Sequence, residues 1–172
     1  MATKMNVSIR YSTHLPVLME AMKRTTGDVL ELGPGVFSTP VLHWLCETQK
    51  RNLLTIEDNK MWARFCSEYY QTDLHKHLQF DTWDLAKEAI SKPWDVALMD
   101  HSPLERRVEE IKILAPFVKY IVVHDAEDKS EGTSHFSTIK PLFKYYWRFE
   151  GVRPNTAVYS NLVDLKDFKV YA

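Results

Sequence analysis

The sequence has little cysteine, almost no net charge and no long apolar run. Its two cysteines, Cys46 and Cys66, exclude a disulfide framework and show neither a CxxC spacing nor a Cys/His zinc pattern. So little cysteine favours a reducing compartment, and we expect a cytoplasmic protein. The formal net charge of -1 argues against a protein dedicated to binding nucleic acid or anionic membranes. No stretch approaches the roughly 18 apolar residues of a membrane-spanning helix.

The chain does have the composition of one globular core. Hydrophobic residues make up 45% of the 172 residues and charged residues 26%, which is an ordinary mixture for a folded protein. The length is close to the roughly 150 residues of a typical domain. Because no internal repeat, low-complexity tract or linker interrupts the pattern, we expect a single domain over residues 1–172.

Apolar runs alternate along the chain with stretches of helical periodicity. The predicted strands are residues 28–32, 52–57, 77–80, 94–99, 118–123, 145–149 and 157–163. The predicted helices are residues 15–24, 38–49, 61–70, 85–90, 104–114 and 136–143, with Ser12 or Thr13 and Ser38 or Thr39 as the N-caps of the first two.

This order predicts an α/β fold with a doubly wound, mostly parallel sheet of seven strands that helices cover on both faces. A short turn joins the last two strands, so we expect a C-terminal antiparallel hairpin at one edge. Ligands of such sheets sit beyond the carboxyl ends of the strands. The residues that follow each strand are therefore the candidate site.

The first strand runs into a glycine-containing loop, Glu31-Leu-Gly33-Pro-Gly35. Glycines let the backbone approach a ligand closely and turn into a helix whose N–H groups favour an anionic group. A tight turn between strand and helix explains the same glycines without a ligand. Glu31 adds weight to a ligand site, because a carboxylate inside an apolar strand needs a cationic or hydrogen-bonding partner.

Acidic residues follow the second and third strands. Glu57 and Asp58 lie where a carboxylate can accept hydrogen bonds from both hydroxyls of a ribose, and a solvated strand end is the alternative. Asp81 and Asp84 flank Trp83, a pattern that suits the edge and wall of an adenine site. Capping of the next helix by Asp84 explains that pattern nearly as well.

A His/Asp pair follows each of the fourth and fifth strands. Asp100-His101 and His124-Asp125 would converge on one crevice. A histidine can act as a general base near neutral pH, and a neighbouring carboxylate orients it or raises its basicity. The same four groups suit a divalent metal, and an Asp at a strand end also often caps the following helix.

Two other groups of polar residues are predicted to be structural or solvated. Arg106 and Arg107 lie among glutamates on an expected exposed helix face with i,i+4 ion pairs. His75 and His77 lie in a polar stretch and are expected to be solvated.

Taken together, the motifs resemble the class I S-adenosylmethionine-dependent methyltransferases. They are Val29-Leu-Glu-Leu-Gly-Pro-Gly35, Glu57 after the second strand and Asp100 after the fourth, and the resemblance extends from about Thr13 to Val163. Within that class the chain is most similar to the small catechol O-methyltransferase-like type, whose first strand reads Leu-Glu-Leu-Gly and whose fourth ends in Asp-His. The resemblance implies the Rossmann-like methyltransferase fold and S-adenosyl-L-methionine as the cofactor.

The resemblance also implies which residues contact each part of the cofactor. Around the methionine part it places Glu31, Gly33 and Gly35, with Ser38 near the carboxylate. Glu57 would bind the ribose hydroxyls, and the adenine would lie near Asp81, Trp83 and Asp84. Asp100 and His101 would face the reactive end, while Ser12, Thr13 and His14 would close over the cofactor.

The chain departs from the family pattern at two places. Phe37 stands where many relatives have a third glycine. In the metal-dependent catechol type an Asp-Asn pair ends the fifth strand, whereas here Asp125 is followed by Ala126. A magnesium site of that type would need Glu127 or Asp128 to replace the missing ligand.

The function that follows is methyl transfer to an oxygen or nitrogen of a small-molecule acceptor, with no nucleic-acid or membrane partner. The candidate bases are Asp125, His101 and His124, in that order. Specificity would come from the short loops at residues 1–14 and 126–136, or from a partner chain such as a second copy in a homo-oligomer. The alternative is a non-catalytic S-adenosylmethionine- or nucleotide-binding or interaction module on the same fold. A nicotinamide oxidoreductase is disfavoured, because position 38 is Ser where the glycine fingerprint needs Gly.

Overall fold

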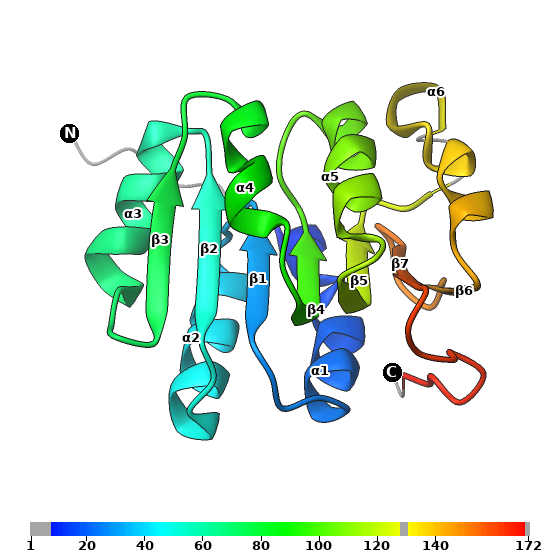
Figure 1. The fold of residues 1–172 in the computed structure, drawn as a ribbon, viewed down its shortest axis with the longest axis horizontal. Coiled ribbons are helices and arrows are strands. Elements are labelled where there is room, and N and C mark those ends of the chain that lie inside the picture. The colour runs from blue at the N-terminus through cyan, green and yellow to red at the C-terminus, as the bar shows by residue number, and fades with distance from the viewer. Residues whose placement is uncertain (1–7, 128–130, 171–172) are drawn as a thin grey trace.

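A seven-stranded sheet runs through the middle of the molecule, as the computed structural model of residues 8–127 and 131–170 shows (Figure 1). The strands lie in the order β3-β2-β1-β4-β5-β7-β6. The first five in this order are parallel, and β7 is antiparallel to both β5 and β6. The strands are β1 (Val29–Leu32), β2 (Leu53–Glu57), β3 (His75–Gln79), β4 (Trp94–Met99), β5 (Val118–His124), β6 (Tyr145–Phe149) and β7 (Thr156–Ser160).

Helices cover the two faces of the sheet (Figure 1). On one face α4 and α5 pack over the central strands, and on the other face α1 and α2 do so, with α3 beside α2 over β2 and β3. The helices are α1 (Leu15–Lys23), α2 (Ser38–Gln49), α3 (Lys60–Tyr70), α4 (Lys87–Ile90), α5 (Arg107–Leu114) and α6 (Glu131–Ser134). Short 3-10 turns cover Ile9–Ser12 (η1), Trp83–Ala86 (η2), Leu104–Arg106 (η3), Phe136–Thr138 (η5) and Lys140–Leu142 (η6).

The central strands are apolar throughout because both of their faces are covered. Every residue of β1 and of β4 is buried. In β1, Leu30 and Leu32 join the core under α4 and α5, while Val29 joins the core under α1 and α2. In β4, Met99 belongs to the core under α4 and α5, and Leu98 belongs to the core under α1 and α2. A parallel sheet buried on both faces thus explains the continuous apolar runs of the sequence.

The predicted α/β sheet of seven strands with an antiparallel C-terminal pair is confirmed. The predicted helix at 136–143 is wrong: the chain forms two 3-10 turns there, because Pro141 has no N–H to continue an α-helix. The predicted loop after the fifth strand contains the short helix α6, and residues 128–130, Asp128 among them, lie outside the described residues.

Neither predicted pair of helix caps forms. The N-cap of α1 is His14 and the N-cap of α2 is Phe37, and neither side chain makes a capping hydrogen bond. Ser38 and Thr39 lie inside the first turn of α2, both buried. The Thr13 hydroxyl instead donates a hydrogen bond to the carbonyl oxygen of Pro154 at 2.9 Å.

His75 is fully buried rather than solvated, which corrects the prediction. Its ring nitrogens lie 2.9 Å from Nδ1 of His43 and 2.8 Å from the hydroxyl of Thr55. Burial lowers the pKa of His75 to about 3 and that of the half-buried His77 to about 4. Helices α2 and α3 pack against β3, so one face of this edge strand is removed from water.

Within the described residues, no helix combines the length and the apolar character needed to cross a bilayer.

Candidate functional site

A pocket of about 740 Å³ lies beyond the carboxyl ends of the central parallel strands. It is the place where a doubly wound sheet offers a crevice, since β1, β2, β4 and β5 all point toward it. The predicted site residues that line it are Gly33, Gly35, Glu57, Asp58, Asp100, His101, His124 and Asp125. Residues that line it and were not predicted include Arg10, Tyr11, Asn59, Trp62 and Arg107.

Gly33 makes the turn that ends β1 against the end of β4. Its φ of +87° lies in the left-handed region, and a Cβ added there would be 2.3 Å from the amide nitrogen of His101. At Gly35 an added Cβ would meet only the hydroxyl of Ser38, at 3.5 Å. Gly33 is therefore required by local packing, and Gly35 leaves room beside the pocket.

Glu31 lies behind this turn and outside the pocket lining. Its fully buried carboxyl accepts hydrogen bonds from the Thr39 hydroxyl at 3.0 Å and from the Thr55 hydroxyl at 2.8 Å. The Thr39 oxygen in turn accepts the N–H of Gly35 at 3.0 Å. Burial raises the pKa of Glu31 to about 7, although the threonine hydroxyls oppose the shift. The structure thus gives Glu31 the role of supporting the loop through Thr39.

The acidic end of β2 forms a second wall of the pocket. Oε1 of Glu57 accepts hydrogen bonds from the N–H groups of Asp58 and Asn59, at 3.1 and 2.7 Å. Burial raises the pKa of Glu57 to about 7. Asn59 caps α3 through its side chain, and the half-buried Trp62 follows one turn later. A carboxyl and an aromatic ring therefore share this side of the pocket.

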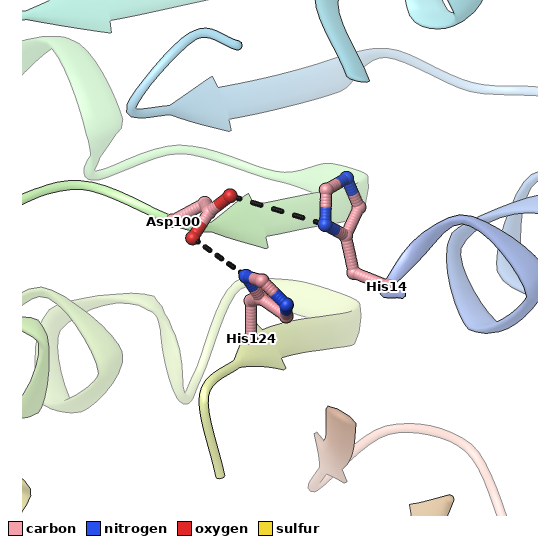
Figure 2. A group of neighbouring side chains, drawn as sticks. All are labelled: His14, Asp100 and His124. Carbon is pink, nitrogen blue, oxygen red and sulfur yellow. Dashed lines mark hydrogen bonds and ion pairs between the residues drawn. The ribbon is translucent and has the colours of Figure 1, made fainter. Parts of the chain in front are cut away.

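Asp100 is the centre of a cluster with two histidines (Figure 2). Nδ1 of His124 donates to Oδ1 of Asp100 at 3.0 Å, and Nδ1 of His14 lies 3.9 Å from Oδ2. Burial opposes ionisation of Asp100, but the hydrogen bond and charge of His124 together with the charge of Arg107 outweigh it, and the pKa of Asp100 lies below its usual value. Burial also opposes the charged form of His124, yet its hydrogen bond to Asp100 and the negative charges of Asp100 and Asp125 together raise the pKa of His124. For His14, burial lowers the pKa to about 4.

Arg107 ties the ends of β4 and β5 together and is 3% exposed, so the prediction of an exposed helix face is wrong for this residue. Its guanidinium donates to the carbonyls of His101 and His124, at 2.6 and 2.9 Å. It also lies 3.3 Å from Asp100 and 3.4 Å from Asp125. The signal in the sequence is that Arg107 follows shortly after Asp100 at the end of a strand, whereas the convergence of four acceptors on its guanidinium is seen only in the structure.

The ring of His101 is turned into the protein. Its Nε2 lies 3.2 Å from the Glu110 carboxyl, and its ring centroid lies 4.0 Å from that of Trp83. Burial lowers the pKa of His101. The Arg106 side chain closes the group by an ion pair with Glu110 at 2.7 Å. Nδ1 of His101 is buried and has no hydrogen-bond partner among the described residues, so neither ring nitrogen is exposed in the pocket.

Several other candidates lie outside the lining. Trp83 is buried and donates its indole N–H to the carbonyl of Ser102 at 2.9 Å. Asp81 forms an exposed ion pair with Lys60 at 3.5 Å. Asp84 does not cap a helix, but pairs with Arg106 at 2.8 Å. Ser38 and His14 are buried away from the lining as well, and Thr13 contacts it through His124 at 2.9 Å.

Of the three candidate bases, Asp125 is the most exposed to the pocket. It follows β5 in a left-handed backbone conformation with φ of +56°, and its side chain is 36% exposed. His124 is 3% exposed, and both of its ring nitrogens are engaged, with Asp100 and Thr13. The cluster therefore offers one carboxylate that a ligand in the pocket can reach directly.

Solved structures share this architecture. A cofactor-bound structure of Rv0187 from MTB superposes with a TM-score of 0.66 at 17% identity, over 92% of this chain and 83% of that one. The S-adenosylhomocysteine (SAH)-bound Podospora anserina methyltransferase PaMTH1 gives 0.62 at 12% identity, over 85% and 76%. The N-terminal domain of human METTL16 in complex with SAH gives 0.59 at 14% identity, over 94% and 73%.

The chain has a methyltransferase fold. No family model and no curated protein sequence matches it, so the likeness rests on structure and concerns the fold. These structures do not support the narrower resemblance to the catechol O-methyltransferase type.

A magnesium ion of the catechol type does not fit the residues present. Such an ion would need Asp100 and Asp125 together, and the guanidinium of Arg107 already lies against both carboxylates. Ala126 supplies no side-chain ligand beside them.

Proposed function

We propose that the protein transfers the methyl group of S-adenosylmethionine to an oxygen or nitrogen of a small-molecule acceptor, with residues 1–172 acting as one domain. One observation carries the proposal. A single pocket of about 740 Å³ joins the Gly33–Gly35 turn, the acidic end of β2 and the Asp100 and Asp125 ends of β4 and β5. This volume is in the range of pockets that hold small ligands.

The lining residues can bind the methionine, ribose and adenine parts of S-adenosylmethionine. The turn with Gly35 can receive the methionine part, and the Glu57 carboxyl, held by two backbone N–H groups, can accept hydrogen bonds from ribose hydroxyls. Trp62 offers an aromatic surface to the adenine. When bound, the cofactor supplies an electrophilic methyl group on a positively charged sulfonium. The carboxylates around the pocket favour that charge.

The chain itself supplies alignment and proton removal. A hydroxyl acceptor must lose its proton as its oxygen attacks, and an ammonium must lose a proton before its nitrogen has a lone pair with which to attack. The Asp125 carboxylate is the group placed to take that proton. Arg107 holds Asp125 and Asp100 in fixed positions through the same guanidinium. Gly33 and its contact with His101 keep the β1 turn closed against β4.

The charge of the pocket favours a small acceptor over a nucleic acid. Four carboxylates line it against two guanidinium groups, and Arg107 is already paired. A polyanion instead requires a basic surface that neutralises its phosphates. The lining acids are Glu57, Asp58, Asp100 and Asp125, and the bases are Arg10 and Arg107.

Calorimetric titration with S-adenosylmethionine and its product SAH tests the binding step. The wild-type chain and the control Asp73→Asn, at an exposed position, should bind both ligands with the same affinity. Glu57→Ala should bind them at least about tenfold more weakly, because a charge-assisted hydrogen bond contributes about 1.5–3 kcal/mol. No heat of binding at millimolar ligand would end the proposal.

Turnover with methyl-labelled cofactor tests the chemistry on panels of phenols, amines and short oligonucleotides. Asp125→Asn should lower kcat by about 100-fold or more and leave the Kd of the cofactor within about twofold. Label on the oligonucleotides and on none of the small molecules would overturn the acceptor class. Binding without label on any acceptor would favour the non-catalytic module.

A further inference from the structure

We propose that His14, Asp100 and His124 form a binding site for a divalent transition-metal ion such as Zn²⁺ or Co²⁺. The three residues come from the start of α1, the end of β4 and the end of β5, and their side chains point toward one another (Figure 2). One ligand atom from each lies within 4.8 Å of the other two. The site shares Asp100 with the magnesium arrangement of the catechol type but has two histidines in place of Asp125, and it does not require methyl transfer.

His14 is the residue that indicates a ligand. Its side chain is 1% exposed, and neither ring nitrogen has a hydrogen-bond partner among the described residues. Its Nδ1 faces Oδ2 of Asp100 at 3.9 Å. That separation exceeds a hydrogen bond of about 3 Å and also the roughly 3.3 Å between two tetrahedral ligands that each lie about 2 Å from one ion, so an ion would draw the two side chains slightly together. An ion between the two atoms would satisfy a buried nitrogen that is otherwise costly to leave unpaired.

The two oxygens of Asp100 have different partners. Oδ1 accepts from Nδ1 of His124 at 3.0 Å and from Arg107 at 3.3 Å. Among the described residues, Oδ2 makes no hydrogen bond and lies 3.9 Å from Nδ1 of His14. The positive charge of Arg107 therefore lies on the Oδ1 and Asp125 side, and the position for an ion lies on the His14 side. Nδ1 of His124 donates to Oδ1, so on binding an ion it would exchange this hydrogen bond for the ion and carry its proton on Nε2.

Thr13 provides the outer partner that a metal-binding histidine needs. Its hydroxyl lies 2.9 Å from Nε2 of His124 and 2.9 Å from the carbonyl oxygen of Pro154. With Nδ1 of His124 on the ion, Nε2–H donates to Thr13, and the Thr13 hydroxyl donates to Pro154. Such a partner fixes the tautomer and the orientation of the ring.

The donor set selects the class of ion. Two imidazole nitrogens and one carboxylate suit Zn²⁺, Fe²⁺ or Co²⁺, whereas Mg²⁺ prefers oxygen ligands. Three protein ligands leave at least one coordination position open. Because Asp100 and His124 line the 740 Å³ pocket, that position can be reached by water or by an oxygen or nitrogen of a pocket ligand.

Titration of the chelator-treated full chain with Co²⁺, followed by equilibrium dialysis and visible absorption, tests the site. We expect one Co²⁺ per chain with a visible band in the wild type and in His135→Asn, the control at an exposed histidine. Asn suits this control because it tolerates the left-handed backbone of His135, φ +55°. His14→Gln should lose the band and bind Co²⁺ more weakly by more than the roughly 10–100-fold that an outer partner contributes.

A second pair of variants keeps the test decisive if His14→Gln fails to fold. Thr13→Val should weaken Co²⁺ binding by roughly 10–100-fold, and Thr13→Ser should restore it. Equal binding and an unchanged band in His14→Gln and Thr13→Val would show binding to surface histidines only and would overturn the proposal, as would no binding to the wild type. These measurements contain no S-adenosylmethionine, so their failure and the failure of cofactor binding are separate results.

Discussion

The buried carboxyl of Glu31 should make the stability of the protein depend on pH, and Glu31→Gln should remove the contribution of Glu31 to that dependence. The pKa of Glu31 is about 7 in the folded chain, against 4.5 as its ordinary value. The folded state therefore binds more protons between these values, and its stability falls as pH rises through them. Each pKa unit corresponds to about 1.4 kcal/mol, so the loss amounts to about 3 kcal/mol between about pH 4.5 and pH 8.

Urea unfolding at several pH values measures this loss. Between about pH 4.5 and pH 8, the unfolding free energy of the wild type should fall by about 3 kcal/mol more than that of Glu31→Gln. The reason is that Gln has no charge to bury. The Gln side chain can still accept the bonds from Thr39 and Thr55. The control Glu88→Gln changes an exposed carboxyl and should run parallel to the wild type. Parallel profiles for Glu31→Gln and the wild type would refute the account of Glu31.

Two further substitutions test the turn and the core. Gly33→Ala should destabilise the chain by about 2 kcal/mol or more and weaken cofactor binding in calorimetry. The reason is that its Cβ would lie 2.3 Å from His101 at a positive φ. Gly132→Ala is the control, because a Cβ there meets nothing within 4 Å. Leu98→Ala should cost about 2–5 kcal/mol in urea unfolding because Leu98 is 0% exposed, whereas Leu85→Ala, 58% exposed, should cost under about 1 kcal/mol. Equal costs within either pair would contradict the packing described.

The fold was largely predictable because the strands are buried on both faces. Such strands read as continuous apolar runs, and Trp94–Met99 was placed to the residue. The half-buried edge strand Tyr145–Phe149 was also placed to the residue. The helix predicted at 136–143 failed because Pro141 interrupts the backbone hydrogen bonding. His75 was misjudged because the sequence around it is polar, while its burial comes from helices packed against β3.

The candidate site was predictable only in part. The residues directly after strands, such as Gly33, Glu57 and Asp100, line the pocket as expected, since parallel strands bring their carboxyl ends to one edge. Trp83 and Asp81 also follow a strand, but β3 is the edge strand and its end lies away from the pocket. Arg107 was missed because its helix pattern resembles an exposed, ion-paired face.

The sequence by itself determined the class of fold, the glycine turn and the acidic strand ends, because these depend on local backbone needs and on apolar periodicity. Only the tertiary structure decided that Glu31 supports the turn through Thr39, and that His14 meets Asp100 and His124. His14 and His124 are far apart in the chain, and their approach depends on how α1 packs beneath β4 and β5. Side-chain direction and burial arise from that packing, and no spacing along the sequence encodes them.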